Sequence, residues 1–142
     1  MTDSHMPKQR VHEWPVRVYY EDTDAAGVVY YANYLRFCER ARTEWLRALN
    51  FHQQQLMRDE GLAFVVTRVE ADYLKGAELD DALTVCSTID SIGRASLCFK
   101  QRIMRDQQTL FVASVTIACV DWARRRPARL PEKLKNLLEP PE

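Results

Sequence analysis

The sequence lacks three features that would identify a partner directly: a net charge, a long apolar run and a paired-cysteine motif. Over 142 residues, 20 Lys and Arg side chains balance 20 Asp and Glu side chains, so no global field attracts nucleic acid or an anionic membrane. No apolar run approaches the roughly 18 residues that span a bilayer, and the N-terminus lacks the apolar core of a signal peptide. We therefore expect a cytoplasmic protein that binds no nucleic acid and has no integral membrane segment.

The cysteines are far apart, and none belongs to a C-x-x-C pair. Three of the four lie inside strand-like runs, where a reduced cysteine acts as a small buried hydrophobe. We expect all four to be reduced, which fits a reducing compartment, and we expect no metal or cofactor site. They are Cys38, Cys86, Cys98 and Cys119.

A helical period follows an acidic turn and extends over residues 31–49. Apolar side chains recur there at spacings of four, three, four and four residues, and charged side chains populate the other face. A helix of this length is about 28 Å long, enough to cross a sheet of average width. The apolar stripe consists of Tyr34, Cys38, Ala41, Trp45 and Leu49.

Alternation of apolar and polar residues predicts strands on both sides of this helix. Four consecutive strands joined by short turns imply an antiparallel sheet, against which the helix packs. One helix cannot cover five strands, so the leftover apolar edge or face predicts self-association. We expect one domain over residues 14–135 between polar tails at 1–13 and 136–142. The predicted strands cover 14–20, 64–73, 83–89, 97–103 and 110–122, and a short second helix covers 53–59.

Residues 21–34, with the sequence EDTDAAGVVYYANY, resemble the signature of the 4-hydroxybenzoyl-CoA thioesterase family of hotdog-fold proteins. The surrounding pattern is most similar to the branch of tol-pal system-associated acyl-CoA thioesterases. The resemblance covers nearly the whole chain, roughly residues 14 to 135. Supporting stretches are residues 14–20, 39–44, 79–81 and 127–131.

The resemblance implies an α+β hotdog fold, in which a five-stranded antiparallel sheet wraps around one long central helix. It also implies a dimer or tetramer with sites at the subunit interface. The expected activity is hydrolysis of an acyl-CoA thioester, or of an acyl group on an acyl carrier protein, to free acid and thiol.

The family's site residues transfer by motif position. The catalytic carboxylate corresponds to Asp24, and the oxyanion donor corresponds to the backbone N–H of Tyr31 at the start of the helix. Basic residues near the turn between the third and fourth strands bind the CoA phosphates, which points to Arg94. Tyr30 and Gly27 are assigned to substrate binding, Tyr30 as pocket lining and Gly27 chiefly for its backbone geometry. The tol-pal branch commonly has His at the position of Tyr31, so this chain departs from it there.

Elementary chemistry supports this assignment of roles. A helix N-terminus presents unpaired N–H groups and the positive end of its dipole, which can stabilise a developing oxyanion. Asp24 can act as a general base on water or attack directly to form a mixed anhydride, and the sequence leaves both routes open. We expect Glu21 to be solvated and Asp22 to form the turn.

Three alternatives remain at this point. Asp24 can merely cap the turn, as Asp often does. A hotdog dehydratase would need a His general base, and all three histidines lie outside the motif; we expect each to be solvated or structural. A non-catalytic acyl-CoA-binding or scaffold protein of lipid or envelope machinery is the third. The histidines are His5, His12 and His52.

Overall fold

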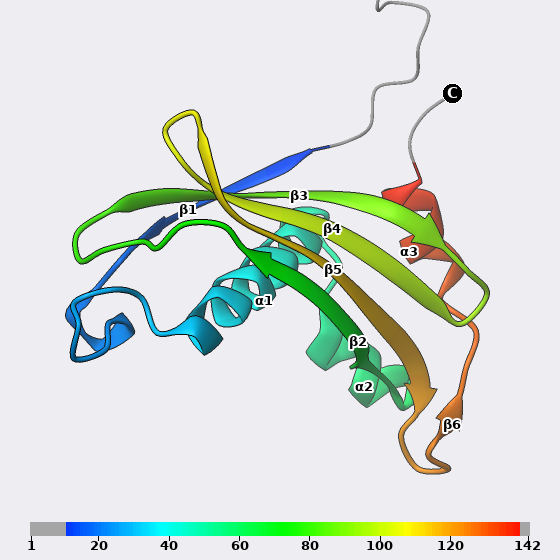
Figure 1. Cartoon of the computed structure of the whole chain (residues 1–142). Coiled ribbons are helices and arrows are strands. Elements are labelled where there is room, and N and C mark those ends of the chain that lie inside the picture. Colours follow the sequence, from blue (N-terminus) through cyan, green and yellow to red (C-terminus); the bar gives the residue numbers. More distant parts are fainter. Residues whose placement is uncertain (1–10, 140–142) are drawn as a thin grey trace, which may run out of the picture.

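One antiparallel sheet forms the frame of the computed structural model, which describes residues 11–139 (Figure 1). The strand order is β1-β3-β4-β5-β2, and a two-residue strand, β6, pairs with β5. The predicted α+β class and the five-stranded antiparallel sheet are therefore confirmed, with β6 as a short addition. The strands are β1 His12–Arg17, β2 Leu62–Tyr73, β3 Ala82–Ile92, β4 Ser96–Arg105, β5 Gln108–Asp121 and β6 Arg126–Pro127.

The long helix α1, Tyr31–Ala48, lies on the concave face of this sheet (Figure 1). It ends one residue before the predicted position. The second helix α2, Gln53–Glu60, also agrees with the prediction and stops at Gly61, whose φ of 68° is the left-handed conformation that favours glycine at a helix end. A third helix, α3 over Glu132–Leu138, was not predicted. Within residues 11–139, no helix combines the length and apolar character needed to cross a bilayer.

The core lies between α1 and the inward-facing side chains of β3, β4 and β5. Along β4 every second side chain is buried, and Phe99 meets Trp45 of α1 edge-on with ring centroids 5.9 Å apart. Along β5 burial alternates from Phe111 to Cys119, so the outward residues of this stretch are half-buried and its inward ones are buried. The long apolar run of residues 110–122 is typical of a strand buried on both faces, but here the outward face is only partly covered.

A buried polar group fixes α1 on the sheet. Gln101 of β4 is fully buried, and its amide nitrogen donates to the Cys38 carbonyl at 3.0 Å and to Ser87 Oγ at 2.9 Å. Its amide oxygen accepts a hydrogen bond from Arg42 Nη1 at 2.9 Å. Every polar atom of the Gln101 side chain is thus used, which holds the helix in one orientation over β3 and β4.

The β2 edge of the concave face is left partly uncovered. Helix α1 packs against β1, β3 and β4, whereas three inward side chains of the edge strand β2 remain open to solvent. Val66 is 52% exposed, Val69 is 40% exposed and Tyr73 is 48% exposed. This is the leftover apolar surface that the sequence predicted.

A β-bulge in β2 changes which residues face inward. The pairing with β5 shifts between Val66 and Arg68, so Val66 and Val69 both face inward although three positions separate them. Strict alternation back from Tyr73 would put Val65 on the inward face, but Val65 pairs with Ala118 on the outward one.

The two ends of the chain also differ from expectation. Strand β1 starts at His12, which stacks on Trp45 at 5.7 Å and is therefore not solvated. The strand predicted over 14–20 ends at Arg17, and Tyr20, which shares the alternation of Val16 and Val18, lies exposed in a 3-10 turn over Tyr20–Asp22. At the other end α3 buries Leu138, so folded structure continues past residue 135. Residues 1–10 and 140–142 of the expected tails, His5 among them, lie outside the described residues.

Candidate active site

The acidic turn is tied to the start of α1 by Asp22. This buried carboxylate accepts a hydrogen bond from the Tyr19 N–H at 2.9 Å. The Asp22 carbonyl accepts two more, from the Tyr30 N–H at 2.9 Å and from Asn33 Nδ2 at 3.0 Å. The expectation that Asp22 forms the turn is confirmed, and its bonds hold the first residues of the helix in place.

Asp24 lies two residues further along, in an exposed reverse turn. Its N–H donates to the Val28 carbonyl at 2.9 Å, and its own carbonyl accepts from the Gly27 N–H at 3.0 Å. Gly27 has a φ of 84°, and nothing lies within 4 Å of the place where its Cβ would be, so the backbone conformation is what requires glycine here.

Only one oxygen of the Asp24 carboxylate accepts a hydrogen bond in the described part of the chain. Its Oδ1 accepts a hydrogen bond from the Ala26 N–H at 2.8 Å, the contact expected of a turn-forming Asp. Among the described residues, no donor contacts Oδ2. The turn therefore fixes the orientation of the carboxylate and leaves one oxygen available to water or substrate.

The start of α1 presents unused backbone donors. Tyr30 caps the helix with an extended backbone, and no side chain bonds to the first turn. The Asn33 N–H reaches the Tyr30 carbonyl at 2.9 Å, whereas the N–H groups of Tyr31 and Ala32 find no acceptor within residues 11–139. These two groups lie at the positive end of the helix dipole, a ready place for negative charge.

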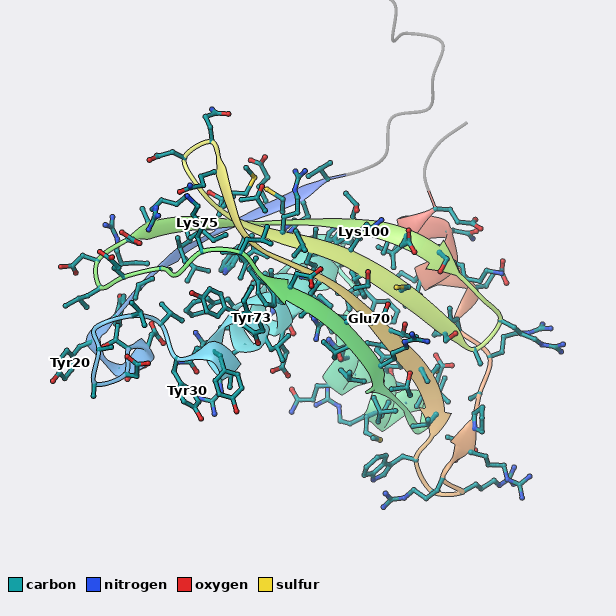
Figure 2. All side chains as sticks on the ribbon, viewed as in Figure 1. Tyr20, Tyr30, Glu70, Tyr73, Lys75 and Lys100 are labelled. Carbon is teal, nitrogen blue, oxygen red and sulfur yellow. The ribbon has the colours of Figure 1, made fainter. Side chains whose placement is uncertain are left out.

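Tyrosine side chains surround this end of the helix. Tyr30 and Tyr31 have ring centroids 4.8 Å apart, and Tyr73 meets Tyr31 edge-on at 6.4 Å. Figure 2 shows Tyr30 and Tyr73 beside the first turn of α1. Tyr34 lies beneath them, and its buried hydroxyl accepts the Ala77 N–H at 2.9 Å.

Two of these hydroxyl groups have raised pKa values. The hydrogen bond with Tyr31 raises the pKa of Tyr30, and the neighbouring charge of Tyr31 adds to this. Burial raises the pKa of Tyr73, with Tyr31 and Tyr34 as further causes. Both hydroxyls therefore remain protonated and able to donate at neutral pH.

Arg94 is not brought to this site within one chain. It lies in the turn after β3, whereas Val29 bonds to Ala77, just before β3 begins. The 11 residues of β3 separate the two places by about 36 Å. Figure 1 shows α1 beginning at one end of the sheet and the β3–β4 turn at the other.

Two hollows of the surface lie elsewhere. A groove of about 1030 Å³ runs over the outer face of the sheet, lined by residues of β2, β3, β4 and β5. A small cavity of about 80 Å³ lies where Arg42 of α1 faces Phe64 and Val66 of β2. Neither contains Asp24 or Tyr31, both of which are exposed on the surface of the single chain. Within the described part, no cluster of three or more His, Cys, Asp or Glu side chains could hold a metal ion.

Sequence reasoning missed the part played by β2 in this site. Tyr73 and Tyr31 are 42 positions apart, and the alternation pattern predicts Tyr73 only as the last residue of the strand over 64–73. The position of Tyr73 at the end of a strand was the only hint, because a side chain at a strand end can lie beside the start of a helix. Ala32, the second free donor, follows Tyr31 directly and could have been named with it.

Comparison with known proteins gives consistent results. The family model of the thioesterase-like superfamily matches residues 18–138. The chain is 51% identical over 122 residues to the acyl-CoA thioesterase YbgC of Haemophilus influenzae, covering 86% of this chain and 90% of that protein. It is 34% identical over 131 residues to YbgC of Helicobacter pylori, covering 86% and 96%.

Solved structures give the same picture. A probable thioesterase from Bartonella henselae superposes with a TM-score of 0.80 at 36% identity, covering 86% of this chain and all of the other. A 1,4-dihydroxy-2-naphthoyl-CoA thioesterase from Synechocystis gives a TM-score of 0.85 at 26% identity, covering 91% and 96%.

Proposed function

Because the chain belongs to the thioesterase-like superfamily of hotdog-fold proteins, we propose that it hydrolyses the thioester of acyl-CoA to a free acid and a thiol. One observation carries the proposal. The turn that orients the half-engaged Asp24 carboxylate leads directly into the helix start whose Tyr31 and Ala32 N–H groups are free. An attacking group and an oxyanion site thus belong to one short, hydrogen-bonded segment. The names of the relatives point to the same activity.

The helix start supplies the electrostatic part of the reaction. As the thioester carbonyl becomes tetrahedral, its oxygen gains negative charge and accepts hydrogen bonds from Tyr31 and Ala32. One well-aimed donor of this kind contributes about 3 kcal/mol to the transition state. The CoA thiolate is a good leaving group, so a strong general acid is not required.

Asp24 supplies the attacking oxygen, directly or through water. As a general base, its free Oδ2 takes a proton from water while that water attacks the carbonyl carbon. As a nucleophile, Oδ2 bonds to that carbon, the C–S bond breaks, and water then hydrolyses the mixed anhydride. Single turnover in ¹⁸O-water separates the routes, because label enters Asp24 only in the second.

Tyr31 takes the place at which the tol-pal branch commonly has His. Its contribution is the backbone N–H and an exposed ring, with no imidazole to share protons with Asp24. Tyr30 lines the same surface, and Gly27 allows the turn that aims Asp24. The mechanism therefore uses one carboxylate and backbone donors.

Self-association completes the site. In one chain Arg94 is remote from Asp24, so a second copy must bring it near, and the uncovered inward face of β2 offers the contact surface. Four more arginines lie at the Arg94 end of the sheet, and none of these five forms an ion pair within residues 11–139. Such unpaired guanidinium groups suit the phosphates of CoA. They are Arg124, Arg125, Arg126 and Arg129.

The described histidines argue against dehydratase chemistry. His12 stacks on Trp45, and His52 bonds to Asn50 at 3.0 Å. Neither is part of the turn around Asp24, so within residues 11–139 no imidazole is placed to act as general base there. The proposed reaction also extends to acyl groups carried on the thiol arm of an acyl carrier protein, because the bond that breaks is the same.

A panel of acyl-CoA esters monitored for free thiol tests the proposal. Asp24→Asn should lower kcat by about 10²–10⁴-fold, the usual contribution of a general base. Glu21→Gln is the matched control, since Glu21 is an exposed carboxylate three residues away with no polar contact in the described part. Tight acyl-CoA binding without thiol release would favour a binding protein instead, and full activity of a folded Asp24→Asn protein would exclude this mechanism.

A further inference from the structure

Tyr73 is held against the start of α1 from several sides. It is the last residue of β2, and its ring lies edge-on to Phe111 at 4.9 Å and to Tyr34 at 5.4 Å. Packing against these two buried rings limits the directions in which its hydroxyl can point. That hydroxyl donates a hydrogen bond to the Tyr31 carbonyl at 3.1 Å.

The acceptor of this bond belongs to the first peptide group inside the helix. The Tyr31 carbonyl and the Ala32 N–H are the two ends of one planar amide. A hydrogen bond to the carbonyl polarises the amide and makes its N–H a stronger donor, and it also fixes the plane in which that N–H points. The Ala32 N–H is one of the two donors that find no acceptor in the described part of the chain.

Folding of one chain gives only a weak reason for the Tyr73 hydroxyl group. In the single chain Tyr73 is 48% exposed, so water can replace its hydrogen bond at little cost to folding, whereas the buried part of the ring does the packing. Hydroxyl and ring therefore have separable effects. Tyr73→Phe removes only the first.

We infer that Tyr73 is a positioning residue for the oxyanion site: through the Tyr31 carbonyl it aims and strengthens the Ala32 N–H as a second donor. The inference rests on the proposed thioesterase function. It assigns to the edge strand β2 a direct influence on the transition state. The charge on the substrate oxygen grows during the reaction, so the contribution of Tyr73 grows with it and appears in kcat rather than in KM.

Steady-state kinetics of Tyr73→Phe provide the first test. Loss of one hydrogen bond to the amide should lower kcat by about three- to tenfold, with KM unchanged. Tyr20→Phe is the matched control, because Tyr20 is an exposed tyrosine whose side chain has no hydrogen bond in the described structure, and it should retain wild-type kcat. An unchanged kcat in Tyr73→Phe, or a loss confined to KM, overturns the inference.

The carbonyl stretch of a bound ketone analogue, in which CH₂ replaces the thioester sulfur of acyl-CoA, gives a readout without turnover. The infrared band should shift to lower frequency on binding to the wild-type protein, and by less in Tyr73→Phe. Equal shifts in the two proteins contradict the inference. Failure of this inference can be distinguished from failure of the proposed function. If Asp24→Asn is inactive and Tyr73→Phe has wild-type kcat, only the role of Tyr73 is refuted. If Asp24→Asn is fully active, the proposed thioesterase mechanism itself is refuted.

Discussion

The two halves of the concave sheet face have different tasks. Under α1, the half formed by β1, β3 and β4 is complete within one chain: its apolar side chains are buried and Gln101 is fully hydrogen-bonded. The β2 half leaves Val66, Val69 and Tyr73 partly open. We therefore expect stability to depend mainly on the first half, and the proposed self-association on the second.

The largest loss of stability should come from truncating a core side chain in the half of the sheet that α1 covers. Phe99→Ala removes a fully buried ring that packs on Trp45 and leaves a cavity, so we expect the free energy of unfolding to fall by about 3–5 kcal/mol. Urea denaturation measures it. A loss below about 1 kcal/mol would contradict the assignment of the core to this half.

Removing the buried amide of Gln101 beneath α1 should lower the free energy of unfolding by less than Phe99→Ala does. Gln101→Leu leaves Arg42 and Ser87 without their buried amide partner, and we expect a loss of about 1–3 kcal/mol. Gln107→Leu, in the exposed β4–β5 turn, is the control and should stay within about 0.5 kcal/mol of wild type. Equal effects of the two substitutions would show that the buried amide has no special role.

Alkaline pH should weaken the covered half through Cys38. Burial raises the pKa of this thiol from its ordinary 9.0 to about 12, and the positive charge of Arg42 only partly offsets this. The folded state therefore keeps a proton that the unfolded state loses. The resulting stability is complete below pH 9.0 and is lost as the pH rises towards about 12.

The slope from this one group is at most about 1.4 kcal/mol per pH unit. Thermal unfolding at a series of pH values should show the decline in the wild-type protein and a shallower one in Cys38→Ala. Identical slopes would mean that other groups cause the decline.

The smallest effect on the folded chain should come from the uncovered half. Val66→Lys changes a side chain that is half exposed, so the isolated chain should lose no more than about 0.5 kcal/mol. Self-association, measured by sedimentation, should nevertheless be lost, because a charge enters the apolar contact surface. Val11→Lys, equally exposed but outside this face, should associate as wild type does. An unchanged sedimentation profile of Val66→Lys would place the contact elsewhere.

Local patterns predicted the elements that local interactions determine. The spacing from Tyr34 to Leu49 gave α1 to within one residue, because a helix stripe is a property of nearby positions. Helix α3 was missed because its pattern is short and follows prolines, although Leu134 and Leu138 are buried. The bulge after Val66 was missed because it depends on pairing with β5, which lies far along the chain.

The candidate site was predictable only in part, for the same reason. Asp24 and Tyr31 belong to one continuous motif, so its resemblance to the family signature was enough to predict both. Tyr73 reaches Tyr31 only after β2 has paired with β5, and the distance between Arg94 and Asp24 appears only when the direction of β3 is known. Contacts between distant segments are decided by the fold as a whole, and no short pattern contains them.

The bulge in β2 has a consequence for aggregation. An unprotected edge strand offers its free backbone groups to any extended chain, which is how ordered aggregates grow. The shift between Val66 and Arg68 divides that edge, so a straight incoming strand can match it in register on only one side. A second copy carries the same irregularity, so we expect it to match this edge where an arbitrary segment does not. The β2 edge, which we propose takes part in self-association, is thus also a poor template for fibril growth.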